Sequence, residues 1–252
     1  MICLSVLVPG IRNENWYNLY KSIKNQIDKI EVIFVGPYAL PNYMEKLHDV
    51  KYIKDFGSPM RCTQIAFINA CGKYVICASD DSYFIDNHLK TCMCLLEPLE
   101  KTAISCKYYE GDNPKNVYES DEYYKFNHHD SLRGPYFKDD WTILNSGLIK
   151  RQLLEDIGGW STEFECTAMG YSDLAARLHF YGIDIKLYKH AVTQCTQDGP
   201  ESKLHQPVVE AQSQHDQPLF KKKYGHVGCV NQVKIDINNW KNSDIIWKRR
   251  FS

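Results

Sequence analysis

The sequence predicts an α/β protein with a mostly parallel central sheet and helices on both faces of that sheet. Three observations support this fold class. Short, continuous apolar runs, typical of strands buried on both faces, alternate with segments that are apolar on one side, typical of helices. The alternation repeats as β-α-β-α-β-α, which favours right-handed crossovers and a ligand crevice at the carboxyl ends of the strands. The length, 252 residues, suits one large α/β unit with an appendage.

Composition excludes several classes of protein. Hydrophobic residues make up 44% of the chain, and 30 basic residues nearly balance 31 acidic ones, so we expect an ordered globular protein that does not bind nucleic acid. The ten cysteines form no CxxC pair, which favours reduced thiols and a cytoplasmic location. The apolar N-terminal run meets Pro-Gly after eight residues, too early for a signal peptide or a transmembrane segment.

The apolar pattern predicts the first strands and the first helix. Residues 2–8, 30–35 and 50–53 are apolar runs that we interpret as strands. Between the first two runs, four side chains recur at the spacing of one helix face, namely Trp16, Leu19, Tyr20 and Ile23. The chain therefore begins in the order β-α-β.

The second predicted helix carries its own start and stop signals. Ser58 is a typical N-cap residue, and Pro59 fits the first helical position. Gly72 fits the stop of this helix, where a residue that tolerates positive φ is favoured. Residues 74–78 then predict a fourth strand, and Asp86 fits the cap of a further helix.

The second half of the chain begins with a change in composition. Residues 107–140 are rich in Tyr, Asp, Asn and His and lack apolar periodicity, so we expect a long excursion there. A strand, two helices and a last strand are expected at residues 141–149, 150–157, 167–182 and 183–193, with Gly158-Gly159 closing the first of these helices. We expect a main domain over residues 1–198, and a C-terminal extension over residues 199–252 that packs on or near the functional site.

The strongest chemical signal is a pair of acids after the fourth predicted strand. Asp80 and Asp81 follow Ser79 where the crevice is expected. One or two carboxylates together with substrate phosphates are a common way to hold Mg²⁺ or Mn²⁺. Arg61, on the preceding helix, could approach the same phosphates. The alternative is that both acids cap the next helix and meet the positive end of its dipole.

Five segments occur in an order that carries a family resemblance: LSVLVPGIRN, EVIFVG, SPMRCTQIAFINACGKYVICASDDSYF, LNSGLIKRQLLEDIGGWSTEF and GYSDLAARLHFYG. Together they resemble the GT-A fold glycosyltransferases, especially the family 2-like enzymes, over about residues 2–195. The resemblance implies a metal-dependent transferase that moves a sugar from a nucleotide-diphospho-sugar to a hydroxyl group of a glycan or another acceptor. Ser79-Asp80-Asp81 matches the DxD motif of this family, with Asp81 as the direct ligand of Mn²⁺ or Mg²⁺ and Asp80 beside it.

The resemblance also implies which residues bind the donor nucleotide. The loop containing Pro9, Ile11 and Arg12 matches the loop that packs on the nucleoside, and Arg61 matches the basic residue at the start of the following helix. The second strand of the family often ends in an acid that contacts the base, whereas this chain has Gly-Pro there. Asp55, after the third strand, is the candidate for that contact.

Two further matches concern the donor sugar and catalysis. Asp173 matches the acid of the xED element, which is the catalytic base in inverting members, so we expect Asp173 to take the proton of the acceptor, with inversion. The alternative for Asp173 is a helix acid that favours the dipole. Trp141, Asn145, Ser146 and Gly147 match the segment that lines the donor sugar, although Trp141 can equally be a core residue.

Relatives commonly complete the metal site with a histidine after the last strand, but this chain has Cys195 there. His190, His205 and His215 lie nearby in the sequence, and the choice among them stays open.

We expect the 107–140 excursion and the C-terminal extension to select the acceptor.

Two other functions stay open. A nucleotidyltransferase has a related sheet and an acid-bound magnesium ion, but such enzymes usually carry a glycine-rich GxG loop after the first strand, where this chain has PGIRN. A non-catalytic carbohydrate-binding relative would be expected to lose its acids, whereas Asp80, Asp81 and Asp173 are all present.

Overall fold

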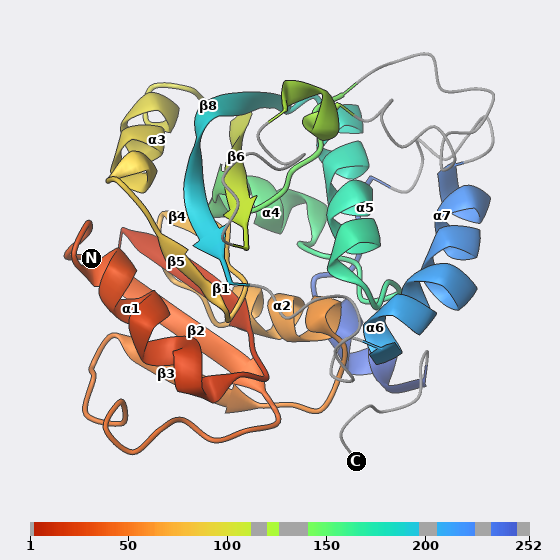
Figure 1. The fold of residues 1–252 in the computed structure, drawn as a ribbon. Coiled ribbons are helices and arrows are strands. Elements are labelled where there is room, and N and C mark those ends of the chain that lie inside the picture. Colours follow the sequence, from red (N-terminus) through yellow and green to blue (C-terminus); the bar gives the residue numbers. More distant parts are fainter. Residues whose placement is uncertain (1–2, 112–119, 126–140, 197–205, 225–232, 246–252) are drawn as a thin grey trace.

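The structure is a computed structural model that describes residues 3–111, 120–125, 141–196, 206–224 and 233–245. The described residues form an eight-stranded, mixed and mostly parallel sheet with the order β3-β2-β1-β4-β7-β6-β8-β5 (Figure 1). The strands are β1 Leu4–Pro9, β2 Ile30–Gly36, β3 Val50–Lys54, β4 Tyr74–Cys77, β5 Ser82–Phe84, β6 Thr102–Glu110, β7 Leu148–Lys150 and β8 Asp184–Cys195. The α-helices are α1 Trp16–Lys24, α2 Pro59–Ile68, α3 His88–Leu96, α4 Arg151–Ile157, α5 Thr167–Phe180, α6 Gln206–Ala211 and α7 Gln217–Tyr224.

Most strands of the sheet end at the same edge. β1 pairs in parallel with β2 and with β4, and β6 pairs in parallel with β8. β7 lies between β4 and β6 and is antiparallel to both, so β4 and β6 run in the same direction. The carboxyl ends of β1, β2, β4, β6 and β8 therefore meet at one edge, which is where ligands bind in open α/β sheets.

Helices cover both faces of the sheet (Figure 1). On one face, α2, α4, α5 and α7 bury side chains such as Phe67, Leu154 and Leu174. On the other face, α1 and α3 bury side chains such as Leu19 and Leu89. Every residue of β2 is buried, which explains why its sequence is a continuous apolar run rather than an alternating one. The predicted fold class, α/β with a mostly parallel sheet and helices on both faces, is confirmed.

The predicted start of α2 and the predicted end of α4 are confirmed, but the predicted end of α2 is wrong. Ser58 is the N-cap of α2 and Pro59 is its first residue, as predicted. Gly158 closes α4 with a φ of 85°. α2 ends at Ile68, four residues before the predicted stop at Gly72, and Gly72 does not have a positive φ. A Cβ atom at this position would lie 2.6 Å from the backbone nitrogen of Ser5, so the glycine allows the turn to approach β1 closely.

The helix predicted to begin at Asp86 does not directly follow the acid pair. After Asp80 and Asp81 the chain enters β5, which pairs with β8. α3 begins only at His88, and its N-cap is Asn87, with a φ of 56°. The acids therefore do not cap a helix, which removes the alternative explanation for them.

The predicted excursion at residues 107–140 begins later than expected. β6 continues to Glu110 because its aromatic and polar residues pair with β8, although they lack an apolar pattern. Residues 112–119 and 126–140 lie outside the described residues, so the predicted role of this segment in acceptor selection is not tested. Of the strand predicted at residues 141–149, only the end joins the sheet, as β7.

The C-terminal segment packs against α5. Phe220 and Tyr224 of α7 belong to the same core as α5. Asp216 lies in a π-helical turn between α6 and α7, and its fully buried carboxylate accepts backbone hydrogen bonds from Glu165 at 3.1 Å and Cys166 at 2.6 Å. These N–H groups lie directly before α5, so Asp216 joins the C-terminal segment to the start of that helix. The predicted domain boundary, at residues 198 and 199, lies outside the described residues.

We expect Asp216→Ala to lower the free energy of unfolding by about 2–3 kcal/mol, because two buried N–H groups lose a charged acceptor. For a chain of this size the melting temperature should fall by about 5–10 °C, measured by thermal denaturation. Asp236→Ala is the control, because this exposed carboxylate, among the described residues, accepts its hydrogen bond from the nearby N–H of Asn238. An equal fall in the melting temperature of the two variants would contradict the role of Asp216.

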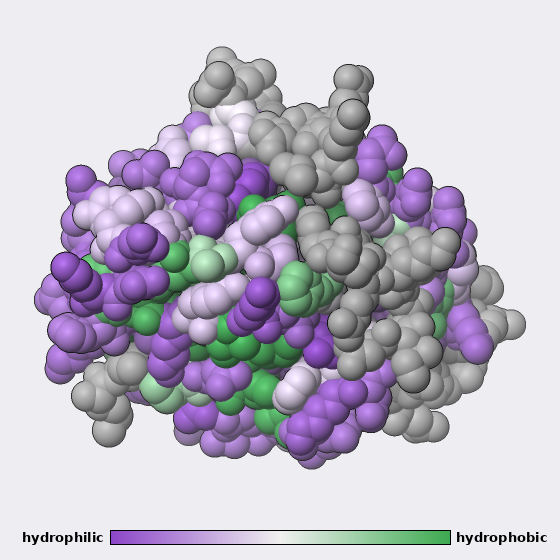
Figure 2. All heavy atoms as spheres, turned by 90° about the horizontal axis from the view of Figure 1, so that it is seen from below, coloured by the Kyte–Doolittle hydropathy of each residue, from purple (hydrophilic) through white to green (hydrophobic). Residues whose placement is uncertain are grey.

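The described surface is largely polar. On the face seen from below, hydrophobic residues gather near the centre and hydrophilic residues surround them (Figure 2). The large hydrophobic side chains exposed on the described residues are Tyr17, Tyr38, Tyr43, Leu95 and Val209.

No helix in the described part of the chain is long and apolar enough to cross a membrane. The predicted cytoplasmic location stays a prediction.

Candidate functional site

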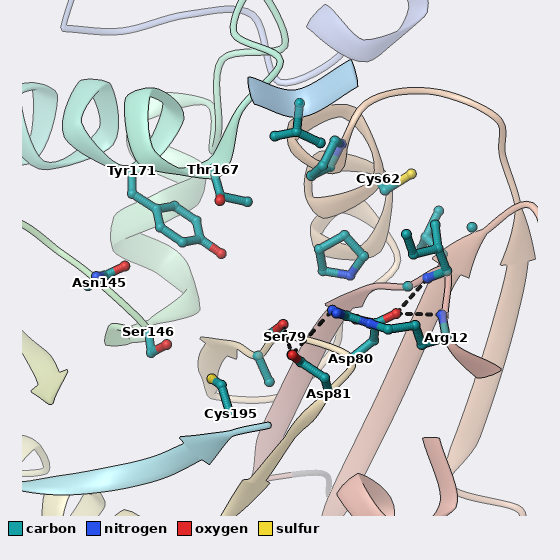
Figure 3. Close-up of a pocket in the computed structure, with 18 of the residues that line it drawn as sticks. Arg12, Cys62, Ser79, Asp80, Asp81, Asn145, Ser146, Thr167, Tyr171 and Cys195 are labelled. Carbon is teal, nitrogen blue, oxygen red and sulfur yellow. Dashed lines mark hydrogen bonds and ion pairs between the residues drawn. The ribbon is translucent and has the colours of Figure 1, made fainter. Parts of the chain in front are cut away.

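A cavity of about 540 Å³ opens at the edge where the parallel strands end (Figure 3). Its β1 side is formed by the loop after β1, the end of β2 and the start of α2, and includes Pro9, Gly10, Ile11, Arg12, Gly36, Pro37, Gly57, Pro59 and Cys62. Its β6 side is formed by the end of β6, the turn before β7, and helices α5 and α6, and includes Tyr108, Glu110, Asn145, Ser146, Thr167, Tyr171, Val208 and Val209. Ser79, Asp80, Asp81 and Cys195 also line the cavity.

Asp80 joins the end of β4 to the loop after β1. One of its carboxylate oxygens accepts hydrogen bonds from the backbone N–H groups of Ile11 at 2.6 Å and Arg12 at 2.7 Å. The other oxygen accepts one from Nε of Arg12 at 2.9 Å and pairs with the terminal guanidinium nitrogen (Figure 3). Since Asp80 is only 2% exposed, this charge-assisted contact fixes the loop after β1 in place.

Asp81 lies beside this contact. Its carboxylate accepts a hydrogen bond from the Ser79 hydroxyl and lies 3.3 Å from the guanidinium of Arg12. The Asp81 carbonyl accepts hydrogen bonds from both the N–H and the hydroxyl of Thr196, at 3.2 and 3.1 Å. Asp81 is thereby held between the ends of β4 and β8, and its side chain lines the cavity.

The described lining of the cavity carries three carboxylates and one guanidinium. Among the described residues, the charged side chains of the lining are Arg12, Asp80, Asp81 and Glu110, and Arg12 pairs with Asp80. Within that part of the chain, no three His, Cys, Asp or Glu side chains are grouped so that they could hold a metal ion. Carboxylates and substrate phosphates commonly hold Mg²⁺ or Mn²⁺ together. Of the two acids after β4, Asp81 is the one that could hold a cation together with a phosphate group, because both oxygens of Asp80 are bound to the loop after β1.

Glu110 is an acid of the cavity that the sequence pattern did not predict. It is the last residue of β6, and it lines the cavity together with Tyr108, two residues earlier on the same face of the strand. In the sheet, Glu110 lies opposite Cys195, which in turn lies opposite Ser82. In a strand, positions 108 and 110 face the same side, and this alternation was the sequence signal that could have placed Glu110 in the cavity. The strand itself was not predicted here, because the segment is polar.

The pKa of the Cys195 thiol is raised by its burial and by the negative charge of this region. Burial raises its pKa well above the usual range, and the carboxylates of Asp81, Glu110 and Asp80 raise it further. The positive charge of Arg12 lowers the pKa of Cys195. Cys195 is therefore a neutral thiol at physiological pH, and the acids from both sides of the cavity are close enough to act on it.

Asp55 and Arg61, predicted to bind the donor, do not line the cavity. They form an ion pair with a distance of 3.0 Å. Arg61 also donates a hydrogen bond to the Ser243 hydroxyl at 2.7 Å, and its guanidinium lies 5.6 Å from the ring centre of Trp240. These contacts direct Arg61 toward the C-terminal segment, which the sequence pattern of α2 could not show. Their predicted roles stay predictions.

Asp173 lies on the far side of α5 from the cavity. Thr167 and Tyr171 of this helix line the cavity, and a residue two positions after Tyr171 points about 200° away around the helix axis. The carboxylate is 1% exposed, pairs with Arg177 at 2.7 Å, and accepts a hydrogen bond from Tyr224 at 2.5 Å. Because α5 begins at Thr167, Asp173 is not in its first turn either. The predicted base role stays a prediction, and this placement does not favour it.

Trp141 and Gly147 flank the cavity-lining residues Asn145 and Ser146 without lining the cavity themselves. Trp141 is 5% exposed and stacks on His179 at a ring distance of 5.2 Å, so it packs as a core residue. A Cβ atom at Gly147 would lie 2.1 Å from the side chain of Leu144, so this glycine permits close packing within the turn.

The histidines considered for a metal site lie elsewhere or outside the described residues. His190 is exposed on β8 and stacks on His88 with a ring distance of 4.8 Å. His215 contacts the carboxylate of Asp216 at 2.8 Å. Neither lines the cavity. His205 lies outside the described residues.

Comparisons with known proteins identify the fold. No family model matches the chain, and no curated protein matches it. TarS from S. aureus in complex with UDP matches with a TM-score of 0.56 and 16% identity over 79% of this chain and 62% of that chain. TarS in complex with UDP-GlcNAc matches with a TM-score of 0.56 and 14% identity over 96% and 73% of the two chains. The mannosyltransferase PcManGT from Pyrobaculum calidifontis, in complex with GDP-Man and Mn²⁺, matches with a TM-score of 0.59 and 17% identity over 94% and 68%. The chain has the GT-A fold.

The likeness concerns the fold, because the sequences are only 14–17% identical. The chain spans 62% of the TarS chain in the complex with UDP. Within the GT-A fold of this chain, the structure brings eight of the predicted residues to one cavity, namely Pro9, Ile11, Arg12, Ser79, Asp80, Asp81, Asn145 and Ser146. The other five lie outside the lining, namely Asp55, Arg61, Trp141, Gly147 and Asp173.

Proposed function

We propose that this protein is a glycosyltransferase that moves a sugar from a nucleotide-diphospho-sugar to a hydroxyl group of a glycan or another acceptor, with a divalent cation and with inversion. The observation that carries the proposal is the buried contact between Asp80 and Arg12, which joins two strand ends beside the cavity. Nucleotides bind at this edge in open α/β sheets. The likeness in fold to TarS with UDP-GlcNAc and to PcManGT with GDP-Man and Mn²⁺ supports the same class of donor.

The β1 side of the cavity suits the nucleoside. Its lining consists largely of glycine, proline and apolar residues, against which a flat base and a ribose can pack. The loop that carries Ile11 and Arg12 is held in place by Asp80, so this surface exists before a ligand binds. Preorganisation of this kind lowers the cost of ordering the loop upon binding.

The acid pair and the β6 side suit the diphosphate and the sugar. In this proposal Asp81 holds a Mn²⁺ or Mg²⁺ ion together with the diphosphate, and when bound the ion would stabilise the negative charge that develops on the leaving group. The guanidinium of Arg12 places a positive charge 3.3 Å from the Asp81 carboxylate. Asn145, Ser146 and Tyr171 offer hydrogen-bonding groups to the sugar hydroxyls on the other side.

Thermal denaturation with UDP, GDP, UDP-GlcNAc and GDP-Man, each with and without Mn²⁺, tests the proposal. We expect at least one of these ligands to stabilise the protein in the presence of Mn²⁺. At a ligand concentration about 100 times Kd the gain is about 2.7 kcal/mol, which corresponds to about 5–10 °C for a chain of this size. Release of nucleoside diphosphate from the stabilising donor would then show turnover.

The other candidate functions give different results in the same assay. Stabilisation by nucleoside triphosphates, with pyrophosphate released when a sugar phosphate is added, would indicate a nucleotidyltransferase. Stabilisation by oligosaccharides, with no response to any nucleotide, would indicate a carbohydrate-binding protein. A protein that responds to none of the four nucleotide ligands would contradict the proposal.

A further inference from the structure

We infer that Glu110 is the catalytic base of this protein, and that it takes the proton of the acceptor hydroxyl as the sugar is transferred. This inference rests on the proposed glycosyltransferase function. In the step, the acceptor oxygen forms a bond to the anomeric carbon while the bond from that carbon to the diphosphate oxygen breaks. The leaving diphosphate keeps the bonding electron pair, and the acceptor proton passes to a carboxylate oxygen of Glu110.

Glu110 stands on the opposite side of the cavity from the loop after β1. It lies opposite Cys195 in the sheet, and Cys195 lies opposite Ser82, the residue after Asp81. Neighbouring strands are about 4.8 Å apart, so the Cα atoms of Glu110 and Ser82 are about 10 Å apart. Both the Asp81 and Glu110 side chains line the cavity. This separation leaves room for a sugar between a carboxylate that holds the diphosphate and one that meets the acceptor.

The other candidate acids lie at the loop after β1 or away from the cavity. Both oxygens of Asp80 are bound to the loop after β1, through two N–H groups and the Arg12 guanidinium. Asp81 bonds to the Ser79 hydroxyl beside the same guanidinium. Asp173 is buried off the cavity against Arg177 and Tyr224. Among the described acids that line the cavity, Glu110 is the one on the β6 side.

The surroundings of Glu110 suit an acceptor. Tyr108 lies on the same strand face, and Val208 and Val209 of α6 line the same side of the cavity. Val209 is 47% exposed, so this side of the cavity reaches solvent. Glu110 as a whole is half-buried, and its Oε2 atom is buried. A carboxylate in such a position can receive a proton from an incoming hydroxyl, and general base catalysis of this kind contributes about 10²–10⁴-fold to the rate.

The test compares Glu110→Gln with the wild type in two measurements. The first is the affinity for UDP or GDP with Mn²⁺, measured by calorimetry. The second is the hydrolysis of UDP-GlcNAc or GDP-Man, whichever stabilises the wild type, with water as the acceptor. We expect unchanged nucleotide affinity and a kcat that falls by about 10²–10⁴-fold. Glu110→Ala should lose a similar factor and recover part of its rate when formate is added as an external base.

Glu100→Gln is the matched control, because Glu100 is exposed and lies just before the other end of the same strand. It should keep both the nucleotide affinity and the rate. A Glu110→Gln variant that hydrolyses the donor within about threefold of the wild type, or that loses nucleotide affinity to the same degree as rate, would overturn the inference. If the wild type itself binds neither nucleotide, the proposed function has failed rather than the assignment of its base.

Discussion

Replacing Asp81 with Asn is expected to remove the Mn²⁺-dependent part of the affinity for the nucleotide-diphospho-sugar. In the proposed function, Asp81 is the cavity carboxylate that shares the ion with the diphosphate, and an amide provides no negative charge to hold it. Loss of partners that only orient a metal ligand costs about 10–100-fold in metal affinity, so loss of the ligand itself should cost about 100-fold or more. Calorimetry with UDP and GDP, with Mn²⁺ and with EDTA, measures this loss.

Two other variants make the result specific to Asp81. Asp184→Asn removes the same charge from the exposed, opposite end of β8 and should leave nucleotide affinity unchanged. Asp80→Asn should reduce affinity with and without Mn²⁺ alike, because it releases the loop that carries Ile11 and Arg12. Equal nucleotide affinity of the wild type in Mn²⁺ and in EDTA, or an Asp81→Asn variant that still responds to Mn²⁺, would contradict the assignment of Asp81.

The sheet and the centre of the site could be predicted because they depend on short-range signals. Apolar runs mark the strands that are buried on both faces, and strands that run in the same direction end at one edge. Residues directly after β1 and β4 must therefore lie close together, since these strands are neighbours in the sheet. The family resemblance implied one site for Arg12 and Asp80, which are 68 positions apart in the sequence, and the pairing of β1 with β4 explains why they meet.

The predicted residues that do not line the cavity make contacts that the local pattern does not contain. Tyr224 and Arg177 hold Asp173 in the core, and Trp240 and Ser243 hold Arg61. In both cases a partner comes from the C-terminal segment, whose docking no local signal predicts. The orientation of Asp173 also depends on where α5 begins, because a shift of one residue rotates a side chain by about 100° around a helix.

Arg177→Met is expected to destabilise the protein strongly. Arg177 is 2% exposed, pairs with Asp173 at 2.7 Å, and donates hydrogen bonds to the carbonyls of Ile157 at 3.3 Å and Gly159 at 2.7 Å. Removing one partner of a buried ion pair leaves the other charge uncompensated, which costs about 3–5 kcal/mol. This is a large part of the 5–15 kcal/mol that is typical of a folded protein. The melting temperature should fall by about 10 °C or more, as measured by circular dichroism.

The double variant Arg177→Met with Asp173→Asn decides why stability is lost. If the cost comes from the unpaired carboxylate, removing its charge should restore a large part of the stability, because an amide oxygen can still accept the hydrogen bond from Tyr224. A double variant no more stable than Arg177→Met would show instead that the lost bonds to Ile157 and Gly159 dominate.

The single variant Asp173→Asn distinguishes a structural role of Asp173 from the predicted role as catalytic base. A structural Asp173 predicts that Asp173→Asn loses stability while its folded fraction still hydrolyses the donor, whereas a catalytic base predicts lost turnover at undiminished stability.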